Sequence, residues 1–556
     1  MIIKRKKRVL FSTEFSNSST GYGVYGQNLL SRLHSLGKYE IAEFASFVSC
    51  NDIRDGNIKH HLYCNEPSPN DEAAKQQYAT NDANKTGAYR FDKVLLDFRP
   101  DIVCEFRDTT MFEYEMMTPL RKFFYWLTSP SLDSAPQLSE WVSTLMNADQ
   151  VLNYTDYAGE VLRKEGGGKI NIAGTAYTGA NFDIFKPISQ KDVLRQSLGL
   201  NPNAFIVSMN GRNQIRKMFI ELIKAFRLYL DKIQTIDPNL YNNSFLYLHT
   251  TLPDLKPWSI SKALVQFGLT NHTLVTYNCT KCNKFFPNKY QETITSCRFC
   301  GGQALLPRVG YNISPDALNQ VYNVSDIYVQ YANRGAAEFP LIEAAAAGCN
   351  IMAVDYAGTG DVCRRLGGIP IKVLSLNREI NVDADAAVPC NNHLSDELVN
   401  FARRPRQINL RNGYKLSEIA RKKFSWDKNA EIWEKAIDNA NLTGMQGKWH
   451  QNINYQPAQV NPNDNIYNWV YSILNFAIQE PHLKHTVFID EMIKWAEVGI
   501  RSTGNGIIQW GRQELTNILN SMVQNKQTLE ALRSGQLMLP EEDWLKYAET
   551  KVLANI

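Results

Sequence analysis

The sequence lacks several features that would place it in a specialised class. It has no uninterrupted apolar run of about 18 residues, the length at which a membrane-spanning helix is expected. Its formal charge is only +4, too small to indicate a polyanionic partner by itself. Ten cysteines in 556 residues are too few for a disulfide-built fold. The basic start, Met1 to Arg8, is followed by Glu14 and Asn17 rather than a signal-peptide core. These absences predict a reduced, cytoplasmic protein.

The chain has the composition of an ordinary globular protein, with 44% hydrophobic and 21% charged residues. At about 150 residues per domain, its length predicts three to four structural units. In its first part, strand-like runs alternate with segments of helical spacing. The strand-like runs are residues 9–13, 102–104, 123–126 and 150–152, and the helical segments are residues 24–36, 137–146 and 157–164. Such alternation favours a parallel sheet covered by helices on both faces.

A second region repeats this alternation. Its predicted strands are residues 205–210, 245–248, 327–329 and 351–354, and its predicted helices are residues 218–230 and 340–347. The sequence therefore predicts an α/β fold of two Rossmann-like domains, residues 1–187 and 188–447. Helical spacing returns at 466–478, 487–498 and 509–522, after a linker rich in Asn, Gln and Pro. We therefore expect residues 448–556 to form a helical C-terminal domain.

A glycine-rich loop follows the first predicted strand. Gly21 and Gly23 allow backbone amides to approach a ligand, and the helix that follows offers unpaired N–H groups suited to a phosphate. The spacing to Gly26 matches the dinucleotide-binding fingerprint, although no acidic residue ends a second strand near residue 45. The alternative interpretation is a tight strand–helix turn.

The turn after the strand at 205–210 carries three cations: Arg212, Arg216 and Lys217. Ligands of open α/β sheets bind beyond the carboxyl ends of the strands. A diphosphate leaving group would need fixed positive charge there, which Arg212 and Lys217 could supply. The alternative is a solvated basic turn.

The segment from Glu338 to Gly348 predicts a short helix that begins near Pro340 and ends at Gly348. Glu343 lies among apolar and small residues of this helix. A buried carboxylate is costly unless it accepts hydrogen bonds, and vicinal ribose hydroxyls would supply them. The alternative is a solvent-facing glutamate.

Taken in order, these motifs resemble the retaining nucleotide-sugar glycosyltransferases of family 4, which have the two-domain GT-B fold. The resemblance covers about residues 8–440. The residues that carry it are Thr20 to Gly23, Thr178 to Pro187, Gly211 and Arg212 with Lys217, Glu338 to Gly348, Gly358 to Asp361, and Phe424 to Trp426.

The resemblance implies that a nucleotide-sugar donor binds in the cleft, on the second domain. Arg212 and Lys217 would hold its diphosphate and Glu343 its ribose. The phosphate site would be completed by Gly21, Tyr22, Gly23, Gly358, Thr359 and Gly360. The chain would cross between domains after residues 183–187, and a helix at about 426–437 would return to the first domain.

The sequence departs from the family pattern at two positions. Gly335 stands where the family usually has a first glutamate, so Glu338 is expected to take over its role toward the sugar. The first-domain segment 125–130 lacks the histidine of many members, and Asp133 just beyond it is expected to contact donor sugar or acceptor. The predicted catalytic residues are Arg212, Lys217, Glu338 and Asp133.

The missing histidine leaves the expected reaction possible. In a retaining front-face displacement the departing diphosphate oxygen accepts the acceptor's proton, so the protein mainly positions groups and neutralises charge. No divalent metal is required for this step.

Four cysteines in the second region have zinc-ribbon spacing. Cys279 and Cys282 form one pair, Cys297 and Cys300 the other, with 14 residues between them. Four thiolates leave no open coordination position, so we expect a structural Zn²⁺ in an inserted ribbon at residues 276–304. Disulfides are the alternative.

The ribbon sequence is basic and aromatic. It holds Lys281, Lys284, Lys289 and Arg298 against Glu292, with Phe285 and Phe286 adjacent. This pattern is consistent with nucleic-acid contact, and protein docking or a plain scaffold are the alternatives.

The sequence therefore predicts a retaining glycosyltransferase with two alternative acceptors: a hydroxymethylated base in DNA, or a saccharide or glycolipid. A further alternative, motivated by Gly335 and the absent histidine, is a catalytically inactive nucleic-acid- or protein-binding module on the same scaffold.

Overall fold

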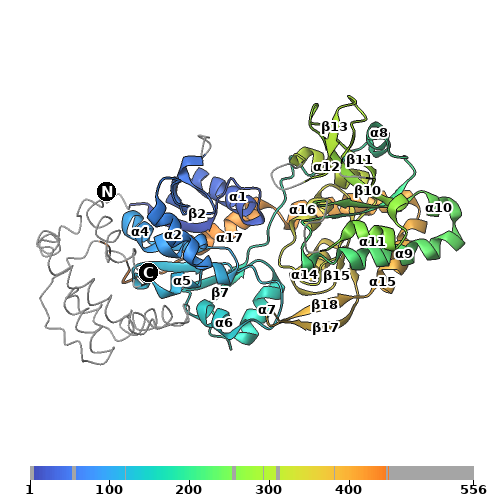
Figure 1. The fold of residues 1–556 in the computed structure, drawn as a ribbon. Coiled ribbons are helices and arrows are strands. Elements are labelled where there is room, and N and C mark those ends of the chain that lie inside the picture. The colour runs from blue at the N-terminus through green and yellow to red at the C-terminus, as the bar shows by residue number, and fades with distance from the viewer. Residues whose placement is uncertain are drawn as a thin grey trace, which may run out of the picture.

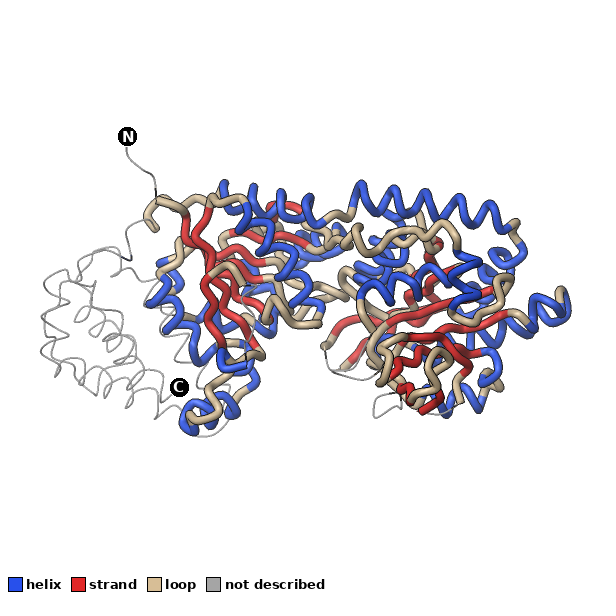
Figure 2. Tube along the Cα trace, turned by 90° about the horizontal axis from the view of Figure 1, so that it is seen from above, coloured by secondary structure: helices blue, strands red, loops and turns tan. Residues whose placement is uncertain are grey.

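The computed structural model describes residues 5–445 and 449, except for residues 53–57, 119, 253–257, 292–293, 308–312 and 381. Two α/β domains lie side by side, each built on its own sheet (Figure 1). Seen from above, the strands of each domain are flanked by helices on both sides (Figure 2). The predicted α/β class with two Rossmann-like domains is confirmed. The predicted helical domain at 448–556 lies outside the described residues except for Trp449, whose Nε1 donates to Pro100 O at 2.9 Å.

The first domain contains a seven-stranded sheet in the order β3-β2-β1-β4-β5-β6-β7, with all neighbours parallel. Its strands are β1 (Lys7–Glu14), β2 (Tyr39–Ser46), β3 (His61–Cys64), β4 (Ile102–Glu105), β5 (Tyr125–Thr128), β6 (Gln150–Asn153) and β7 (Ile172–Thr175). Its helices are α1 (Gly21–Ser35), α2 (Glu72–Thr80), α3 (Asp82–Thr86), α4 (Ala88–Phe98), α5 (Glu113–Met117), α6 (Ser139–Met146) and α7 (Asp156–Glu165).

Successive residues of β1 face opposite sides of this sheet, as the period of two in a strand requires. Val9 and Phe11 pack against α1, whereas Leu10 packs against α4 on the other face. Both faces are therefore buried, which explains why the strands read as continuous apolar runs in the sequence.

The second domain contains a nine-stranded sheet in the order β12-β13-β10-β9-β8-β14-β15-β16, with β11 paired to β10. Its strands are β8 (Phe205–Asn210), β9 (Ser244–His249), β10 (Thr273–Cys279), β11 (Phe285–Lys289), β12 (Ile294–Ser296), β13 (Gln303–Leu305), β14 (Ile327–Gln330), β15 (Asn350–Val354) and β16 (Ile369–Ile371), with a separate hairpin of β17 (Val373–Glu379) and β18 (Ala384–Pro389). Its helices are α8 (Lys191–Ser197), α9 (Phe219–Ile236), α10 (Pro238–Asn242), α11 (Ile260–Gln266), α12 (Pro315–Val324), α13 (Phe339–Ala346), α14 (Ala357–Leu366), α15 (Asn391–Arg403) and α16 (Arg406–Lys423).

The chain crosses between the domains twice, and the two crossings touch. Ala180, just before the first crossing, forms a parallel bridge with Ser425, where the second begins. After it, α17 (Trp426–Asp438) packs beside α1 of the first domain (Figure 1). Trp433 Nε1 donates to Tyr25 Oη at 2.7 Å, inside the first-domain core. The predicted return of this helix is observed.

Two sequence expectations are wrong. Residues 121–123 form a short 3₁₀-helix, so the strand predicted from Phe123 begins only at Tyr125. Cys50 and Cys64 form a disulfide, although the sequence was expected to keep its cysteines reduced. The bond joins the loop after β2 to the end of β3, two segments that neighbouring strands bring together.

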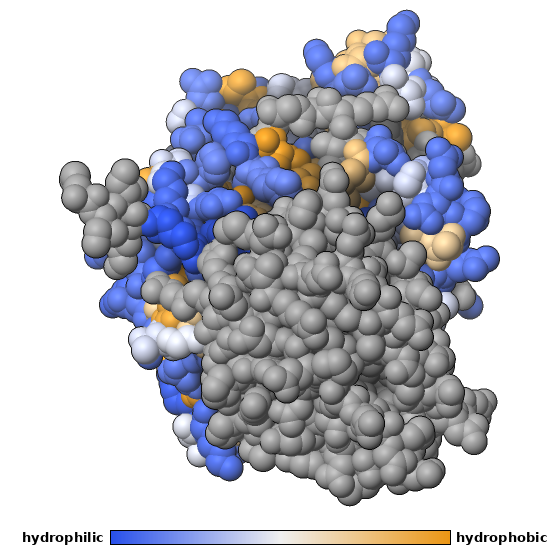
Figure 3. All heavy atoms as spheres, turned by 90° about the vertical axis from the view of Figure 1, so that its left-hand side faces the viewer, coloured by the Kyte–Doolittle hydropathy of each residue, from blue (hydrophilic) through white to orange (hydrophobic). Residues whose placement is uncertain are grey.

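The described surface and helices show how the apolar residues are distributed. Seen from the first-domain end, the visible described surface is mainly hydrophilic, with scattered apolar residues (Figure 3). Among the described residues, no helix is both long and apolar enough to cross a bilayer.

Candidate active site

The candidate site lies where strands of both domains end. Strands β8, β14 and β15 are parallel, so the segments that follow them meet at one edge of the second sheet. The loop after β5 of the first domain faces this edge, because Asp133 Oδ2 accepts from Arg334 Nη1 at 2.6 Å. Arg334 Nε also lies 3.0 Å from Glu379 Oε2 of the β17–β18 hairpin. The site is therefore built from both domains.

Glu338 is the centre of a buried charge cluster. Its Oε2 lies 2.5 Å from Lys217 Nζ and its Oε1 lies 2.7 Å from Arg216 Nη1. Burial by itself would raise the pKa of Glu338, but the charges of Lys217 and Arg216 outweigh it and hold the pKa at about 2. Burial lowers the pKa of Lys217 to about 8, against the opposing effect of the Glu338 carboxylate. The two cations are thus held in place before any ligand binds.

Gly335 leaves the space that the Glu338 carboxylate fills. A Cβ at Gly335 would lie 2.5 Å from Glu338 Oε1 and 2.6 Å from Thr359 Oγ1. No side chain fits at position 335 unless Glu338 moves. The two departures from the family pattern, glycine at 335 and glutamate at 338, are therefore linked by one local packing arrangement.

Glu343 lies on α13 and is half-buried. Tyr322 Oη of α12 donates to its Oε2 at 2.9 Å, and Asn210 Nδ2 at the end of β8 donates to Tyr322 Oη at 3.0 Å. Desolvation raises the pKa of Glu343 to about 7, although the Tyr322 hydrogen bond opposes the shift. In the described part of the chain Glu343 has no ion pair, so its carboxylate has capacity for further donors.

The cations of the turn after β8 differ in burial and in their partners. Arg212 is exposed and forms no ion pair with the described residues, whereas Lys217 is buried. Arg216, which the sequence analysis did not assign a role, is the second cation on Glu338. The sequence places Arg216 next to Lys217, but this position alone did not show that Arg216 rather than Arg212 would contact Glu338.

Gly21 and Gly23 were expected in a loop, but they lie in the first turn of α1, and their surroundings differ. A Cβ at Gly23 would lie 2.1 Å from Ser18 Oγ and 2.6 Å from Ser18 O, and the Gly23 amide donates to Thr20 Oγ1 at 3.0 Å. Gly23 is therefore required by packing, and the Thr20 side chain caps the helix by accepting from the Gly23 amide. Gly21 is exposed, with only Phe339 of the second domain near its Cβ position, at 3.6 Å.

Gly358, Thr359 and Gly360 lie in the first turn of α14. A Cβ at Gly358 would lie 2.0 Å from Ala336 O. The Thr359 amide donates to Gly335 O at 3.1 Å, and the Gly360 amide donates to Tyr356 O at 3.0 Å. The start of α14 thus supports the loop that carries Gly335 and Glu338.

The first-domain side of the candidate site also carries Asp108, which sequence reasoning missed. Tyr22 Oη donates to Asp108 Oδ1 at 2.6 Å. Desolvation and the nearby Asp133 raise the pKa of Asp108, and Arg216 opposes the shift. Asp108 follows β4 without any motif, so only the fold brings it opposite Arg216.

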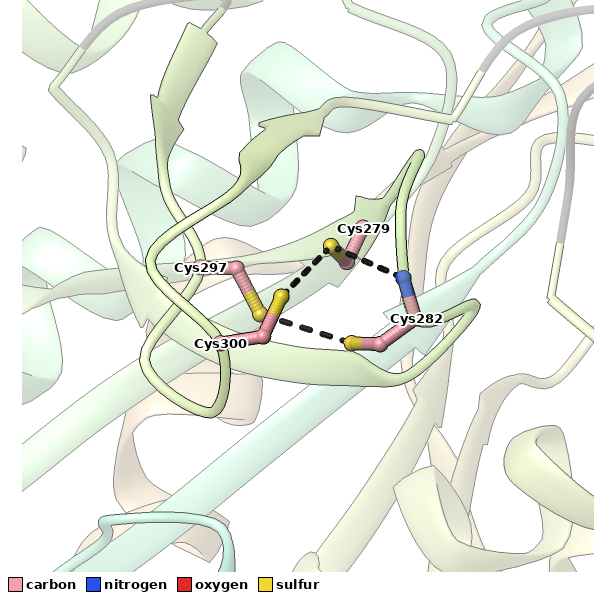
Figure 4. A group of neighbouring side chains, drawn as sticks. All are labelled: Cys279, Cys282, Cys297 and Cys300. Atoms are coloured by element: carbon pink, nitrogen blue, oxygen red, sulfur yellow. Dashed lines mark hydrogen bonds between the residues drawn. The ribbon is translucent and has the colours of Figure 1, made fainter.

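The four ribbon cysteines converge, as predicted (Figure 4). Their Sγ atoms all lie within 4.8 Å of one another, with 3.6 Å between Cys279 and Cys300 and 3.7 Å between Cys282 and Cys297. A tetrahedral Zn²⁺ with Zn–S bonds of about 2.3 Å needs sulfur atoms about 3.8 Å apart. Amides of Lys281 and Cys282 donate to Cys279 Sγ at 3.4 Å, which favours the thiolate. The donor set therefore fits zinc.

The outer surface of the ribbon is basic, but its exposed aromatic residue differs from the expectation. Phe285 and Phe286 are buried in the domain core, at 7% and 2% exposure, because β11 joins the main sheet. Phe299 is instead exposed, with Lys284 Nζ 5.3 Å and Arg298 Cζ 5.7 Å from its ring centroid. The exposed ribbon cations form no ion pair within the described residues; they are Lys281, Lys284, Lys289 and Arg298.

Comparison with known proteins finds solved structures with the same architecture. No protein-family model matches the chain, and no curated protein matches it. Sucrose-phosphate synthase from Thermosynechococcus elongatus is similar in structure, with 14% identity and a TM-score of 0.56 over 78% of this chain and 98% of that one. A glycosyltransferase from Rickettsia africae has 11% identity and a TM-score of 0.54 over 78% and 100% of the two chains. Anabaena HepE, in complex with UDP and glucose, has 11% identity and a TM-score of 0.53 over the same shares. The chain therefore shares the two-domain fold of these proteins.

Proposed function

We propose that the protein is a retaining glycosyltransferase that moves a sugar from a nucleotide-sugar donor to a hydroxyl acceptor. The observation that carries the proposal is the preformed cluster of Lys217, Arg216 and Glu338 at the start of α13, the helix that also carries Glu343. A similar protein, HepE, holds UDP and glucose, which supports a nucleotide-sugar donor.

Different residues bind different parts of the donor. Lys217, Arg216 and the exposed Arg212 neutralise the diphosphate, and Glu343 accepts hydrogen bonds from the ribose hydroxyls. Gly21 and Tyr22 border the phosphates, and the Thr20 cap on the Gly23 amide holds their helix turn in place. Gly358, Thr359 and Gly360 act indirectly, because the start of α14 supports the loop that carries Glu338. Glu338 replaces the glutamate missing at position 335 and faces the sugar from beside the diphosphate.

The reaction follows from this arrangement. The bond between the anomeric carbon and the diphosphate oxygen breaks, and the acceptor oxygen bonds to that carbon on the same face. The acceptor's proton passes to the departing diphosphate oxygen, so no protein base is needed. Lys217 and Arg216 stabilise the charge that develops on the leaving group, and no divalent metal is required. Asp133, held by Arg334, orients the acceptor.

The configuration of the product tests the proposal. The chain is incubated with a panel of nucleotide sugars that includes UDP-glucose, and transfer is followed by mass spectrometry and NMR of the anomeric proton. We expect retained configuration, and a loss of kcat of about 100-fold or more in Lys217→Ala. Exposed Lys428 on α17 provides the control variant Lys428→Ala, which keeps full activity. An inverted product contradicts the retaining mechanism. No binding of any nucleotide sugar favours the inactive binding module.

The acceptor that we put first is a hydroxymethylated base in DNA. The exposed ribbon cations support it, two of which, Lys284 and Arg298, lie beside the exposed ring of Phe299, because such a surface binds phosphates and stacks on bases. Salt-sensitive duplex binding and glucosylation of hydroxymethylated DNA are expected, and both weaken in Lys284→Ala with Phe299→Ala. Transfer to a saccharide or glycolipid, with no salt-dependent DNA binding, instead favours the second acceptor class.

The ribbon is proposed to hold one structural Zn²⁺ per chain. Metal analysis of the purified protein should give one zinc, lost in Cys300→Ser and kept in Cys390→Ser, which changes a cysteine outside the ribbon. Zinc retained by Cys300→Ser would contradict the assignment.

A cytoplasmic location remains our proposal. Reduced ribbon thiolates suit a reducing compartment, whereas the Cys50–Cys64 disulfide is of the kind found in oxidising ones. Cell fractionation separates the two: the chain in the cytoplasmic fraction supports the proposal, and the chain in an oxidising compartment contradicts it.

A further inference from the structure

The zinc ribbon is not an isolated insertion, because one strand belongs to both the ribbon and the donor-binding sheet. The first half of β10 pairs with β9, as far as Val275 opposite Leu248. On its other edge β10 pairs with β11 of the ribbon, where Thr276 lies opposite Pro287. Its last two residues, Asn278 and Cys279, also pair with β13. Cys279, the first cysteine of the cluster, is fully buried at the end of this strand. The position of Thr276 therefore depends on how the ribbon is closed.

Thr276 lies where β10 leaves β9, and its side chain contacts the end of β9. Its Oγ1 lies 2.8 Å from Nδ1 of His249 and 2.9 Å from Oη of Tyr247. Thr276 is fully buried, and His249 is 5% exposed. Water cannot replace the hydroxyl in so small and closed a space, so its loss would leave the His249 ring without this partner.

His249 in turn holds the turn that carries the cations. The Gly211 amide donates to His249 O at 3.2 Å, and Asn210 pairs with His249 in the parallel register of β8 and β9. Gly211 is the first residue of the turn that ends with Lys217. The contacts thus form a continuous path from Cys279 through Thr276 and His249 to the cation-bearing turn.

We infer that Thr276 and His249 are positioning residues that make donor affinity depend on zinc in the ribbon. Zn²⁺ closes the cysteine cluster, which fixes β11 and β13 around the end of β10. Thr276 then orients His249, and His249 orients Gly211 and the turn that begins there. This inference rests on the proposed nucleotide-sugar site for its effect on affinity, but its effect on the turn does not need a nucleotide.

The test uses the full chain, loaded with zinc or treated with a chelator, and two readouts. The first is UDP affinity by calorimetry. The second is hydrogen–deuterium exchange of the Gly211 amide without nucleotide. Zinc removal is expected to weaken UDP binding about fivefold or more, the effect of losing about one hydrogen bond, and to speed exchange at Gly211.

Three variants separate positioning from general stability. Thr276→Val keeps its zinc but binds UDP about fivefold more weakly, with fast Gly211 exchange whether zinc is present or not. Thr276→Ser restores both readouts because it returns the hydroxyl. Thr280→Val is the matched control: Thr280 Oγ1 donates to Gln303 O inside the ribbon at 3.0 Å, so its loss leaves UDP affinity unchanged.

The outcomes distinguish this inference from the proposed function. If the exchange rate of the Gly211 amide changes neither on zinc removal nor in Thr276→Val, the inference is overturned, even where UDP binds tightly. Exchange that responds to both supports it, and an absence of UDP binding in the same samples then counts against the proposed function alone. If Thr276→Val unfolds, the test rests on Thr276→Ser. Zinc content and Gly211 exchange equal to those of the unchanged protein support the inference, and faster Gly211 exchange contradicts it.

Discussion

At the residue scale, two side chains of the site titrate near neutrality, in opposite directions. Glu343 has a pKa of about 7 and must be ionised to accept the ribose hydroxyls, so activity falls as the pH drops through 7. Lys217 has a pKa of about 8 and must be protonated to neutralise the diphosphate, so activity falls as the pH rises through 8. We therefore predict a narrow bell-shaped profile of kcat/KM for the donor, measured by steady-state kinetics. A flat profile between these values contradicts the assignment.

The acidic limb of this pH profile can be tested separately with a variant of Tyr322. Tyr322 donates to the ionised form of Glu343, so Tyr322→Phe should raise the Glu343 pKa and move the acidic limb to higher pH. The basic limb should stay in place, because Tyr322 does not contact Lys217.

Glu338→Gln should move the opposite limb. Removing the carboxylate takes away the charge that stabilises protonated Lys217, whose pKa of about 8 is already lowered by burial. The basic limb of the kcat/KM profile should therefore move below pH 8. Glu431→Gln, a change of an exposed glutamate on α17, is the control that leaves both limbs unchanged. An unmoved basic limb in Glu338→Gln would show that Lys217 does not set it.

The sequence predicted the kind of charge at the site better than the individual side chains. A turn with three cations after a buried strand was visible in the sequence, and Glu338 was expected to compensate for Gly335. The preference of Glu338 for Arg216 over Arg212 was not visible, because it depends on the loop from Gly335 to Glu338 reaching across from another strand.

At the element scale, the start of α1 offers a pair of glycines for a direct test. Gly23→Ala should destabilise the protein by about 1–3 kcal/mol, as overpacking does, because the new Cβ meets the backbone of Ser18 at 2.6 Å. Gly21→Ala, two residues earlier, meets only the Phe339 ring at 3.6 Å and should leave the melting temperature unchanged. Thermal unfolding followed by circular dichroism compares the two variants, and equal melting temperatures would contradict the packing argument.

Elements with strong local signals were predictable. The apolar run at 205–210 is β8 with the predicted bounds, and the helical spacing from 157 to 164 lies within α7. Phe123 and Phe124 were misassigned because an apolar run shows burial but not backbone conformation. The union of the ribbon with the main sheet was also hidden, since it depends on pairing between strands far apart in the sequence.

At the scale of the whole molecule, α14 holds the two domains together. Asp361 Oδ2 accepts from the Asp156 amide at 2.9 Å and from Tyr177 Oη at 2.8 Å, and so caps the start of α7 in the other domain. Arg365 forms an ion pair with Asp156. We predict that Asp361→Ala lowers stability by about 1 kcal/mol and also increases the radius of gyration and the donor KM.

The matched control is Asp71→Ala. Asp71 accepts from the Ala74 amide at 3.0 Å and caps α2 within one domain. This variant should lose a similar stability, measured by thermal unfolding, while small-angle scattering shows an unchanged radius of gyration. If both variants leave the radius unchanged, Asp361 does not control the spacing of the domains.

The contacts between the two domains were the least predictable part of the site: Asp133 was expected there, but its partner Arg334 was not, and Asp108 was missed. Asp108 and Asp133 approach Arg216 and Arg334 only because two separately folded sheets are placed opposite one another. The sequence identified each domain by its own pattern, but no local pattern encodes the distance between them.

The paired crossings have a consequence for how the polypeptide tolerates breakage. Ala180 and Ser425 lie in contact, and beyond them α17 is anchored in the first domain through Trp433. A single proteolytic nick in the segment at 183–187 therefore leaves the halves fastened by the other segment. The cleaved protein should elute as one particle in native chromatography and separate into two fragments only in denaturant.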